Sequence, residues 1–273
     1  MKISSFTHKG MVRQNNEDSC LIIPPWTSIS IRSGASMFAV ADGMGGQNAG
    51  EIASGLAVET ARRWLESVKL NQISIEIVEE LFAQINLEIW NYAQKNPEAS
   101  GMGTTLTMVL IHQSTAICGH IGDSRLYRLR NQQLTQLTND HTLVGEQVRM
   151  GKMTLDQARV HPTRHILSRV LGARQFVTPD IFSVELVPGD IFLLCSDGVY
   201  GMITDQQILD QLKQPEFSEL SGSIIDAANA GGGKDNCTAV VLKIEELPVA
   251  SPGRFSLTRL RNLISHWGEA GSV

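Results

Sequence analysis

The chain has 273 residues, 42% of them hydrophobic and 19% charged, a composition typical of a folded globular protein with one large domain or two small ones. Its net charge of −5 argues against non-specific binding to nucleic acid, which needs a basic surface. The sequence has no signal-peptide pattern at its start and no apolar run of about 18 residues, so we expect no transmembrane segment.

The predicted elements of the first half are two strands followed by two helices. Apolar runs at residues 19–23 and 37–41 predict the strands. Apolar residues recur at three- and four-residue spacing over residues 51–68 and 75–93, which predicts amphipathic helices. We expect these helices to form a hairpin that covers one face of a sheet.

The second half alternates short strands with short breaks. Short links between consecutive strands favour antiparallel pairing, because parallel neighbours need a long crossover. Helical patterns at residues 205–212 and 217–230 supply a second helical layer. The whole order predicts an α+β fold, with two sheets in the middle and helices outside. The strands predicted here are residues 104–112, 114–121, 125–129, 134–137, 190–195 and 237–244.

Two segments differ from this pattern. Residues 143–171 form a basic insertion between strand blocks, with His161 and His165, and such insertions often serve as lids or binding loops. Residues 245–253 have the composition of a linker, and residues 255–267 place apolar side chains on one helical stripe. This tail is either a helix docked on the domain or a frayed end, or else a helix that binds a partner or a membrane surface.

The four cysteines stand far apart and form no CxxC pair, which argues against a zinc ribbon. Cys118, Cys195 and Cys237 lie in apolar, strand-like surroundings. We therefore expect buried, reduced thiols in a cytoplasmic protein.

Four aspartates mark the ends of predicted strands. Asp42, Asp123 and Asp197 follow strands, and Asp235 precedes one. Each alone is compatible with an ordinary turn, but together at one edge of the sheets they would repel one another and require a cation. Carboxylate oxygens without histidine or thiolate partners favour Mg2+ or Mn2+. Gly43, directly after Asp42, would let its backbone carbonyl approach the metal.

The segment RQNNED adds charged groups near the start of the chain. It contains Arg13, Glu17 and Asp18, which form either a solvated loop or part of the same site. In the second interpretation, Glu17 or Asp18 completes the metal site. The fork of the Arg13 guanidinium matches two phosphate oxygens, so it would hold an anionic substrate.

A metal cluster beside a phosphate-binding arginine favours phosphoester hydrolysis. Two metals about 4 Å apart would activate a bridging water for in-line attack on phosphorus. The sequence contains no GxxxxGK[ST] motif, no kinase signature and no cysteine in a CxxxxxR loop. Hydrolysis by metal-bound water is the route that remains.

The chain resembles the metal-dependent serine/threonine protein phosphatases of the type 2C family, most of all the compact bacterial members. Residues 1–247 carry six motifs in that family's order, namely RQNNED, VADGMGG, GMGTT, GHIGDSRLYRL, LLCSDGV and GGGKDNCTAVVL. The resemblance implies one catalytic domain with a four-layer α/β/β/α sandwich and a flap at residues 143–171. The linker and tail, residues 248–273, lie outside it.

The resemblance also implies roles for particular residues. Asp42 would bridge two metals and the Gly43 carbonyl would bind one of them, while Asp197 and Asp235 complete the other. Asp123 would share Asp197 to hold a third, weaker ion. Arg13, Asp42 and Asp197 are the implied catalytic residues, with Arg13 binding the substrate phosphate. The implied metal ligands are Glu17, Asp18, Asp42, Gly43, Asp123, Asp197 and Asp235.

One departure from the family concerns the proton for the leaving group. Many eukaryotic members have a histidine where this chain has Met44, and that histidine is proposed as the general acid. The proton would then come from a water on the third metal or from His161, which we also include as a substrate-binding residue. A locally packed histidine is the alternative for His161.

The sequence thus predicts a phosphoserine/phosphothreonine phosphatase of bacterial signalling, dependent on Mg2+ or Mn2+. Its expected partners are phosphoproteins and a cognate serine/threonine kinase or the targets of that kinase, and we expect a monomer. A non-catalytic phospho-binding module on the same fold is the alternative. A phosphodiesterase or nuclease is a third possibility, against which the acidic net charge counts.

Overall fold

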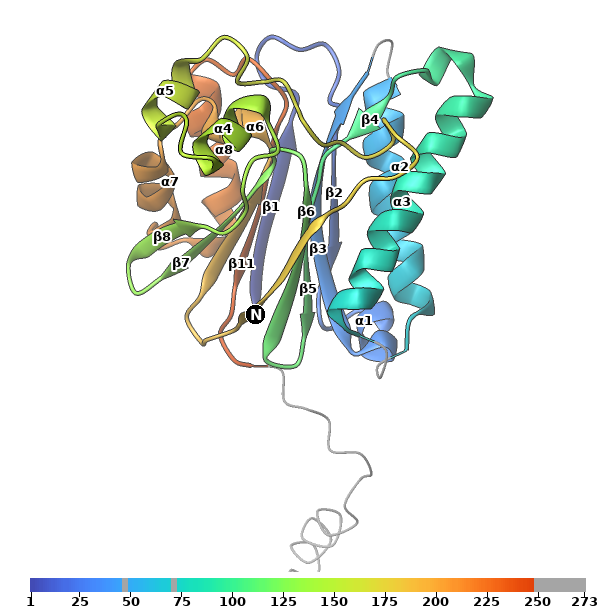
Figure 1. Ribbon diagram of the computed structural model, residues 1–273. Coiled ribbons are helices and arrows are strands. Elements are labelled where there is room, and N and C mark those ends of the chain that lie inside the picture. The colour runs from blue at the N-terminus through green and yellow to red at the C-terminus, as the bar shows by residue number, and fades with distance from the viewer. Residues whose placement is uncertain (46–48, 70–72, 248–273) are drawn as a thin grey trace, which may run out of the picture.

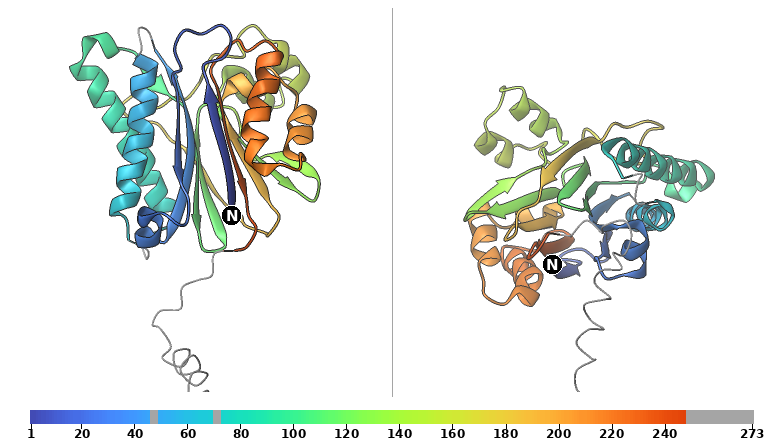
Figure 2. Two further views of the ribbon diagram at one scale, coloured as in Figure 1. Left: turned by 180° about the vertical axis from the view of Figure 1, so that it is seen from behind. Right: turned by 90° about the horizontal axis from the view of Figure 1, so that it is seen from below.

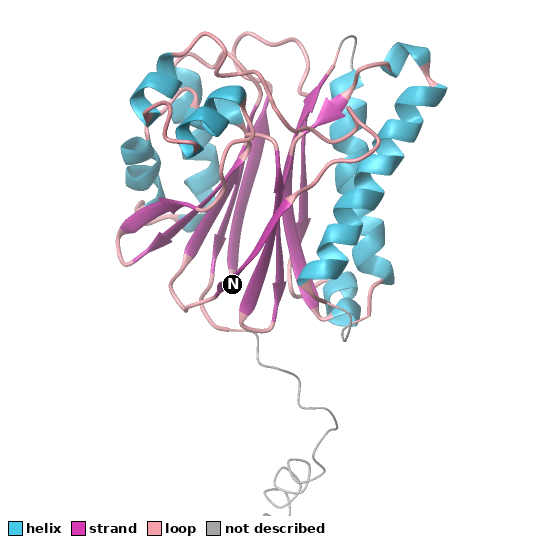
Figure 3. Cartoon of the chain, in the orientation of Figure 1, coloured by secondary structure: helices cyan, strands magenta, loops and turns pink. Residues whose placement is uncertain are grey.

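The structure, a computed structural model, describes residues 1–45, 49–69 and 73–247. Two antiparallel sheets pack face to face, and helices cover both outer faces, as the sequence predicts (Figure 1). Figure 3 shows the same arrangement by element type, with the strands in the middle and the helices on the outside. The predicted tail helix lies outside the described residues.

The six-stranded sheet lies against the long helical hairpin. Helices α2 (Ala49–Ser67) and α3 (Ile75–Lys95) cover this sheet, with α1 (Ser28–Ser33) at one end. The Ser74 side chain caps α3 by accepting from the Ile77 N–H, which defines where this helix begins. The strand order is β2 (Asp18–Ile23), β3 (Ala35–Met44), β5 (Leu106–His112), β6 (Thr115–Ile121) and β9 (Asp180–Glu185), with β4 (Gly103–Thr104) paired to the end of β3.

The five-stranded sheet is covered by the C-terminal helices. Helices α7 (Asp205–Leu212) and α8 (Leu220–Ala230) pack on its outer face, and the short helix α6 (Asp197–Tyr200) follows one of its strands. In both views of Figure 2, these helices lie on the side opposite α2 and α3. The strand order is β1 (Lys2–His8), β11 (Cys237–Lys243), β10 (Ile191–Cys195), β7 (Arg125–Arg130) and β8 (Gln133–Gln136).

Strand β3 shows why the central strands appear in the sequence as unbroken apolar runs. Phe38 and Val40 belong to the core between the two sheets, whereas Met37, Ala39 and Ala41 pack toward the helices. Side chains alternate between the faces of a strand, and here both faces are buried. All five of these side chains are fully buried.

Several elements depart from the sequence predictions. The strand predicted at 104–112 is interrupted at Thr105, whose backbone N–H instead donates to the Asp42 carbonyl at 2.9 Å. The sequence pattern predicts neither β1 nor β9, because these edge strands carry exposed polar residues. The short helices α1 and α6 are not predicted either. The helix predicted at 217–230 begins as a 3-10 turn, Phe217–Glu219, before α8.

The insertion after β8 contains two short helices, α4 (Leu143–Arg149) and α5 (Leu155–Val160), each started by a threonine cap. A bridge between Thr142 and Leu167 joins the two ends of the insertion, and a bridge from Leu171 to Thr104 fixes it to the domain. Across the part of the chain that the structure describes, no helix is both long and apolar enough to cross a bilayer.

Candidate functional site

The predicted acidic residues gather where the two sheets meet at one end. Antiparallel pairing of β2 with β3 sets Asp18 directly opposite Asp42. Asp18 also reaches across to the other sheet, where its Oδ2 accepts hydrogen bonds from Ser196 Oγ at 2.7 Å and Thr238 Oγ1 at 2.6 Å. Through these contacts, Asp18 at the start of β2 is joined to the end of β10, which precedes Asp197, and to β11, which follows Asp235.

Asp42 lies at the electrostatic centre of this group. Burial and the charges of four neighbouring aspartates hold the pKa of Asp42 well above its usual range. Burial and then the charge of Asp235 raise the pKa of Asp197 to about 6. Gathering so much like charge is unfavourable without a compensating cation. The four neighbours of Asp42 are Asp18, Asp197, Asp123 and Asp235.

Asp18 and Asp123 are the most deeply buried acids of the cluster. Asp18 is 7% exposed and Asp123 is 6% exposed. Burial raises the pKa of Asp18 to about 7, although Thr238 and Ser196 donate to it. Burial raises the pKa of Asp123 well above its usual range, and the charge of Asp197 adds to this.

The donor set fits divalent cations of the Mg2+ or Mn2+ type. The ligands would all be oxygens, which such hard ions prefer. One of these oxygens, Asp18 Oδ1, is buried and has no hydrogen-bond partner. A buried carboxylate oxygen without a partner is costly, so this atom fits a position that faces a cation directly or through a bound water.

Within residues 1–45, 49–69 and 73–247, no three His, Cys, Asp or Glu side chains converge as a ready-made ion shell. One acid of the cluster is paired with a cationic side chain, since Arg13 Nη2 donates to Asp235 Oδ2 at 2.7 Å. A cation bound by Asp235 would therefore compete with Arg13 for this carboxylate.

The loop that carries Arg13 and Glu17 is held against the acidic cluster by Asn236. The Asn236 amide donates to the carbonyls of Lys9 and Asn15, and its oxygen accepts from the Glu17 N–H at 2.8 Å. Asn236 directly follows Asp235 but was not among the predicted site residues. Its role depends on a loop more than 200 residues away, which local patterns do not show.

Gly43 stands where the backbone is too crowded for a side chain. A Cβ atom there would lie 2.1 Å from the Gly50 carbonyl oxygen and 2.6 Å from the Glu17 carbonyl oxygen. The Gly43 N–H donates to that Glu17 carbonyl at 3.1 Å. The glycine therefore permits close contact with the backbones of Gly50 and Glu17, and the predicted binding of a metal by its carbonyl stays a prediction. Partial burial raises the pKa of the neighbouring Glu17 carboxyl, against the charge of Arg13.

The two flap histidines differ in their surroundings. His161 follows α5, and its Nδ1 is 2.9 Å from Thr163 Oγ1, a local contact. Its predicted part in substrate binding stays a prediction. His165 is close enough to the cluster for Asp235 to act on it. Burial and Arg164 lower the pKa of His165, and the charge of Asp235 opposes that shift.

Comparisons with known proteins identify the family of the chain. A family model described as Protein phosphatase 2C matches residues 8–229. The serine/threonine phosphatase stp of Listeria monocytogenes is 36% identical over 243 residues, which cover 87% of this chain and 93% of that protein. The serine/threonine protein phosphatase PstP of Mycobacterium tuberculosis is 36% identical over 247 residues. That match covers 89% of this chain but 45% of PstP, so the chain spans about half the length of that relative.

Two solved structures of proteins named PstP show the same fold. The crystal structure of PstP/Ppp superimposes with a TM-score of 0.80 at 36% identity, covering 90% of this chain and 99% of that one. The catalytic domain of PstP in complex with 2 manganese ions gives a TM-score of 0.78 at 34% identity, covering 90% of this chain and 98% of that one.

Proposed function

The chain belongs to the protein phosphatase 2C family, and we propose that it is a metal-dependent phosphatase that hydrolyses phosphoserine and phosphothreonine in proteins. The observation that carries the proposal is the buried acidic cluster around Asp42 beside the half-exposed guanidinium of Arg13. The names of the relatives and the manganese in the PstP catalytic domain support it.

We assign the cation-binding roles as follows. Asp42 and the Gly43 carbonyl, together with Asp197 and Asp235, hold two divalent cations. Asp123 shares Asp197 to hold a third. When bound, the cations supply an activated water and neutralise charge on the phosphoryl oxygens. The residues that complete the set, directly or through water, are Asp18 and Glu17.

The protein's own groups bind and orient the phosphoester. Arg13 is 51% exposed and reaches the cluster, so its fork is available to two phosphoryl oxygens once it leaves Asp235. The crowded backbone at Gly43 keeps the Asp42 strand close to the Glu17 loop. Met44 has no proton to give to the leaving group, and His161 in the flap stays our candidate for contacting substrate.

The proposal extends to the biological setting. The substrates are phosphoproteins made by a serine/threonine kinase, the enzyme acts as a monomer in bacterial signalling, and residues 1–247 form the catalytic domain. The non-catalytic alternative is not favoured, because the predicted acidic residues come together around Asp42. A phosphodiesterase is opposed by the net charge of −5.

The test compares three substrates, namely an aryl phosphate, a phosphothreonine peptide and a bis-aryl phosphate, each with Mn2+ and with a chelator. We expect hydrolysis of both monoesters with Mn2+ and no turnover with the chelator. Turnover of the diester should be slower by about a hundredfold or more, because a diester has one charged oxygen fewer for Arg13 and the cations to bind. Faster cleavage of the diester, or activity that survives the chelator, would contradict the proposal.

Replacing Arg13 by alanine is expected to raise KM for a phosphomonoester by about tenfold while kcat falls much less, because a charge-assisted hydrogen bond contributes about 1.5 kcal/mol. The same variant frees Asp235 from its ion pair, so half-saturation by Mn2+ should need no more metal than in the wild type. Steady-state kinetics at varied substrate and varied Mn2+ check both expectations.

The matched control is Arg62→Ala on α2, which removes an arginine that pairs with Glu59 and Glu66 on the surface. It should leave KM unchanged. An Arg13→Ala protein with the wild-type KM would remove the phosphate-binding role from Arg13.

A further inference from the structure

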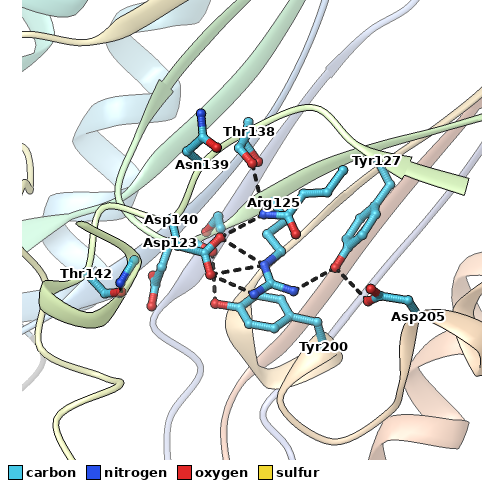
Figure 4. A network of polar contacts seen from close by, with 12 residues as sticks. Asp123, Arg125, Tyr127, Thr138, Asn139, Asp140, Thr142, Tyr200 and Asp205 are labelled. Atoms are coloured by element: carbon cyan, nitrogen blue, oxygen red, sulfur yellow. Dashed lines mark hydrogen bonds and ion pairs between the residues drawn. The ribbon is translucent and has the colours of Figure 1, made fainter. Parts of the chain in front are cut away.

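A polar network centred on Arg125 adjoins the acidic cluster at Asp123 (Figure 4). Arg125 begins β7, two residues after Asp123, and its guanidinium is partly buried. Its Nε is 2.9 Å from Asp140 Oδ1 and its Nη2 is 2.7 Å from Asp140 Oδ2. This bidentate pair fixes the plane of the guanidinium, because the fork matches the two carboxylate oxygens.

Tyr200 joins this network to Asp123 through two different parts of one side chain. The Arg125 guanidinium carbon lies 3.6 Å from the centre of the Tyr200 ring, a cation–π contact. The Tyr200 hydroxyl donates to the Asp123 carbonyl oxygen at 3.0 Å, as Figure 4 shows. The stacked arginine thus holds the ring in the orientation that aims its hydroxyl at the Asp123 backbone.

Tyr200 is also the last residue of α6, the short helix that begins with Asp197. Besides the pairing of Cys195 with Arg125 in the sheet, the Tyr200 hydrogen bond therefore connects the helix of Asp197 directly to the Asp123 backbone. These two carboxylates repel each other, since the charge of Asp197 helps to raise the pKa of Asp123. Groups that repel drift apart unless their backbones are fixed.

The other contacts of the Asp123 turn come from elsewhere. The His141 N–H donates to the Gly122 carbonyl at 2.7 Å, and the Gly122 N–H donates to His141 Nδ1 at 3.2 Å. The Ser124 hydroxyl is 2.8 Å from Thr105 Oγ1. These contacts tie the turn to the root of the flap and to the neighbouring strand, whereas the bond from Tyr200 ties it to α6.

We propose that Tyr200 is a positioning residue that holds Asp123 at a set distance from Asp197 through its hydroxyl, and so determines the affinity for the cation that these two aspartates share. The proposal rests on the cation roles assigned under the proposed function. Tyr200 itself touches neither substrate nor metal.

The test is Tyr200→Phe, which removes the hydroxyl and keeps the ring that stacks on Arg125. The matched control is Tyr127→Phe, which removes another hydroxyl of the same network. The Tyr127 hydroxyl accepts from Arg125 Nη1 at 2.8 Å and donates to Asp205 Oδ1 at 3.2 Å, on the side away from Asp123 (Figure 4). Mn2+ binding to each full-length protein is measured by titration calorimetry without substrate, and thermal unfolding is measured after chelation.

We expect Tyr200→Phe to weaken the weakest Mn2+ binding step by about tenfold, the lower end of what the loss of an outer-shell partner costs. Tyr127→Phe should lower the unfolding temperature at least as much and leave every Mn2+ dissociation constant unchanged. In the hydrolysis assay, Tyr200→Phe should need more Mn2+ for half-saturation and regain nearly the wild-type kcat when Mn2+ is in excess.

The inference would be overturned if Tyr200→Phe had the Mn2+ dissociation constants of the wild type. It would also be overturned if Tyr200→Phe and Tyr127→Phe weakened Mn2+ binding equally, because that result would indicate general destabilisation. A wild-type protein that binds no Mn2+ would overturn it as well. Failure of the proposed function looks different. A protein that cleaves no phosphomonoester but shows the expected Mn2+ shift in Tyr200→Phe alone would refute the phosphatase activity and support the positioning role.

Discussion

The Asp42→Asn variant is expected to lose at least about a thousandfold in kcat/KM on a phosphomonoester. Asp42 stands opposite Asp18 and at the centre of the acidic cluster, so its loss removes the group that we assign to bridge two cations. Metal ions contribute several kcal/mol to neutralising charge in the transition state. Loss of about 4 kcal/mol corresponds to about three powers of ten in rate.

The same variant should be more stable than the wild type when no metal is present. A pKa raised in the folded state means that the folded protein binds protons more tightly than the unfolded chain. The ionised cluster therefore destabilises the metal-free fold as the pH rises from about 4 to about 7, the range set by the usual aspartate value and the raised values of Asp197 and Asp18. Urea unfolding with chelator should show a larger gain from Asp42→Asn at pH 8 than at pH 5.

Asp226→Asn is the matched control, since Asp226 is exposed on α8. It should change neither activity nor the pH dependence of stability. An Asp42→Asn protein with substantial activity would refute the assigned centre, and one that is destabilised at pH 8 would show that other interactions of Asp42 outweigh the repulsion from its neighbours.

Gly198→Ala is expected to destabilise the fold by about 3 kcal/mol or more, the upper range for overpacking a filled site. A Cβ at Gly198 would lie 2.0 Å from the Asn236 carbonyl oxygen. That oxygen belongs to the backbone, so no side-chain rotation relieves the clash. The segments in contact here carry Asp197 and Asp235, so the variant should also bind Mn2+ more weakly.

The control for this variant makes the same chemical change in open space. A Cβ at Gly222, inside α8, would meet no atom within 4 Å. Gly222→Ala should therefore stabilise the fold by about 0.5–1 kcal/mol through helix propensity. Denaturant unfolding of both variants measures the difference, and equal stability of Gly198→Ala and the wild type would mean that the backbone moves apart at no cost.

Local patterns in the sequence were enough to predict the helices whose buried residues repeat regularly along the chain. The helix predicted at residues 51–68 is Ala49–Ser67 in the structure, and the one predicted at 205–212 has those bounds. A buried helix face repeats every three or four residues, so a short window of sequence contains the signal. The edge strands β1 and β9 show no regular repeat of apolar residues, because many of their side chains are polar and exposed.

The positions of the acids along the chain also indicated that they belong together. Asp42, Asp123 and Asp197 come one or two residues after apolar runs, and antiparallel strands bring such ends to one edge of the sheets. That reasoning predicts a cluster of oxygen ligands, and with it a preference for Mg2+ or Mn2+. It does not say which groups surround the cluster.

What surrounds and holds the cluster was decided only by the tertiary structure. Asp18 is bonded to Ser196 and Thr238, partners 178 and 220 residues away. Asn236 holds the loop of Arg13, and Tyr200 holds the carbonyl of Asp123. The sequence by itself therefore determined which residues carry the charge, because residue type and local spacing are properties of short segments of the chain. Only the packing of the two sheets determined which hydroxyls and amides hold those charges, because a hydrogen bond depends on distances that the order of residues does not contain.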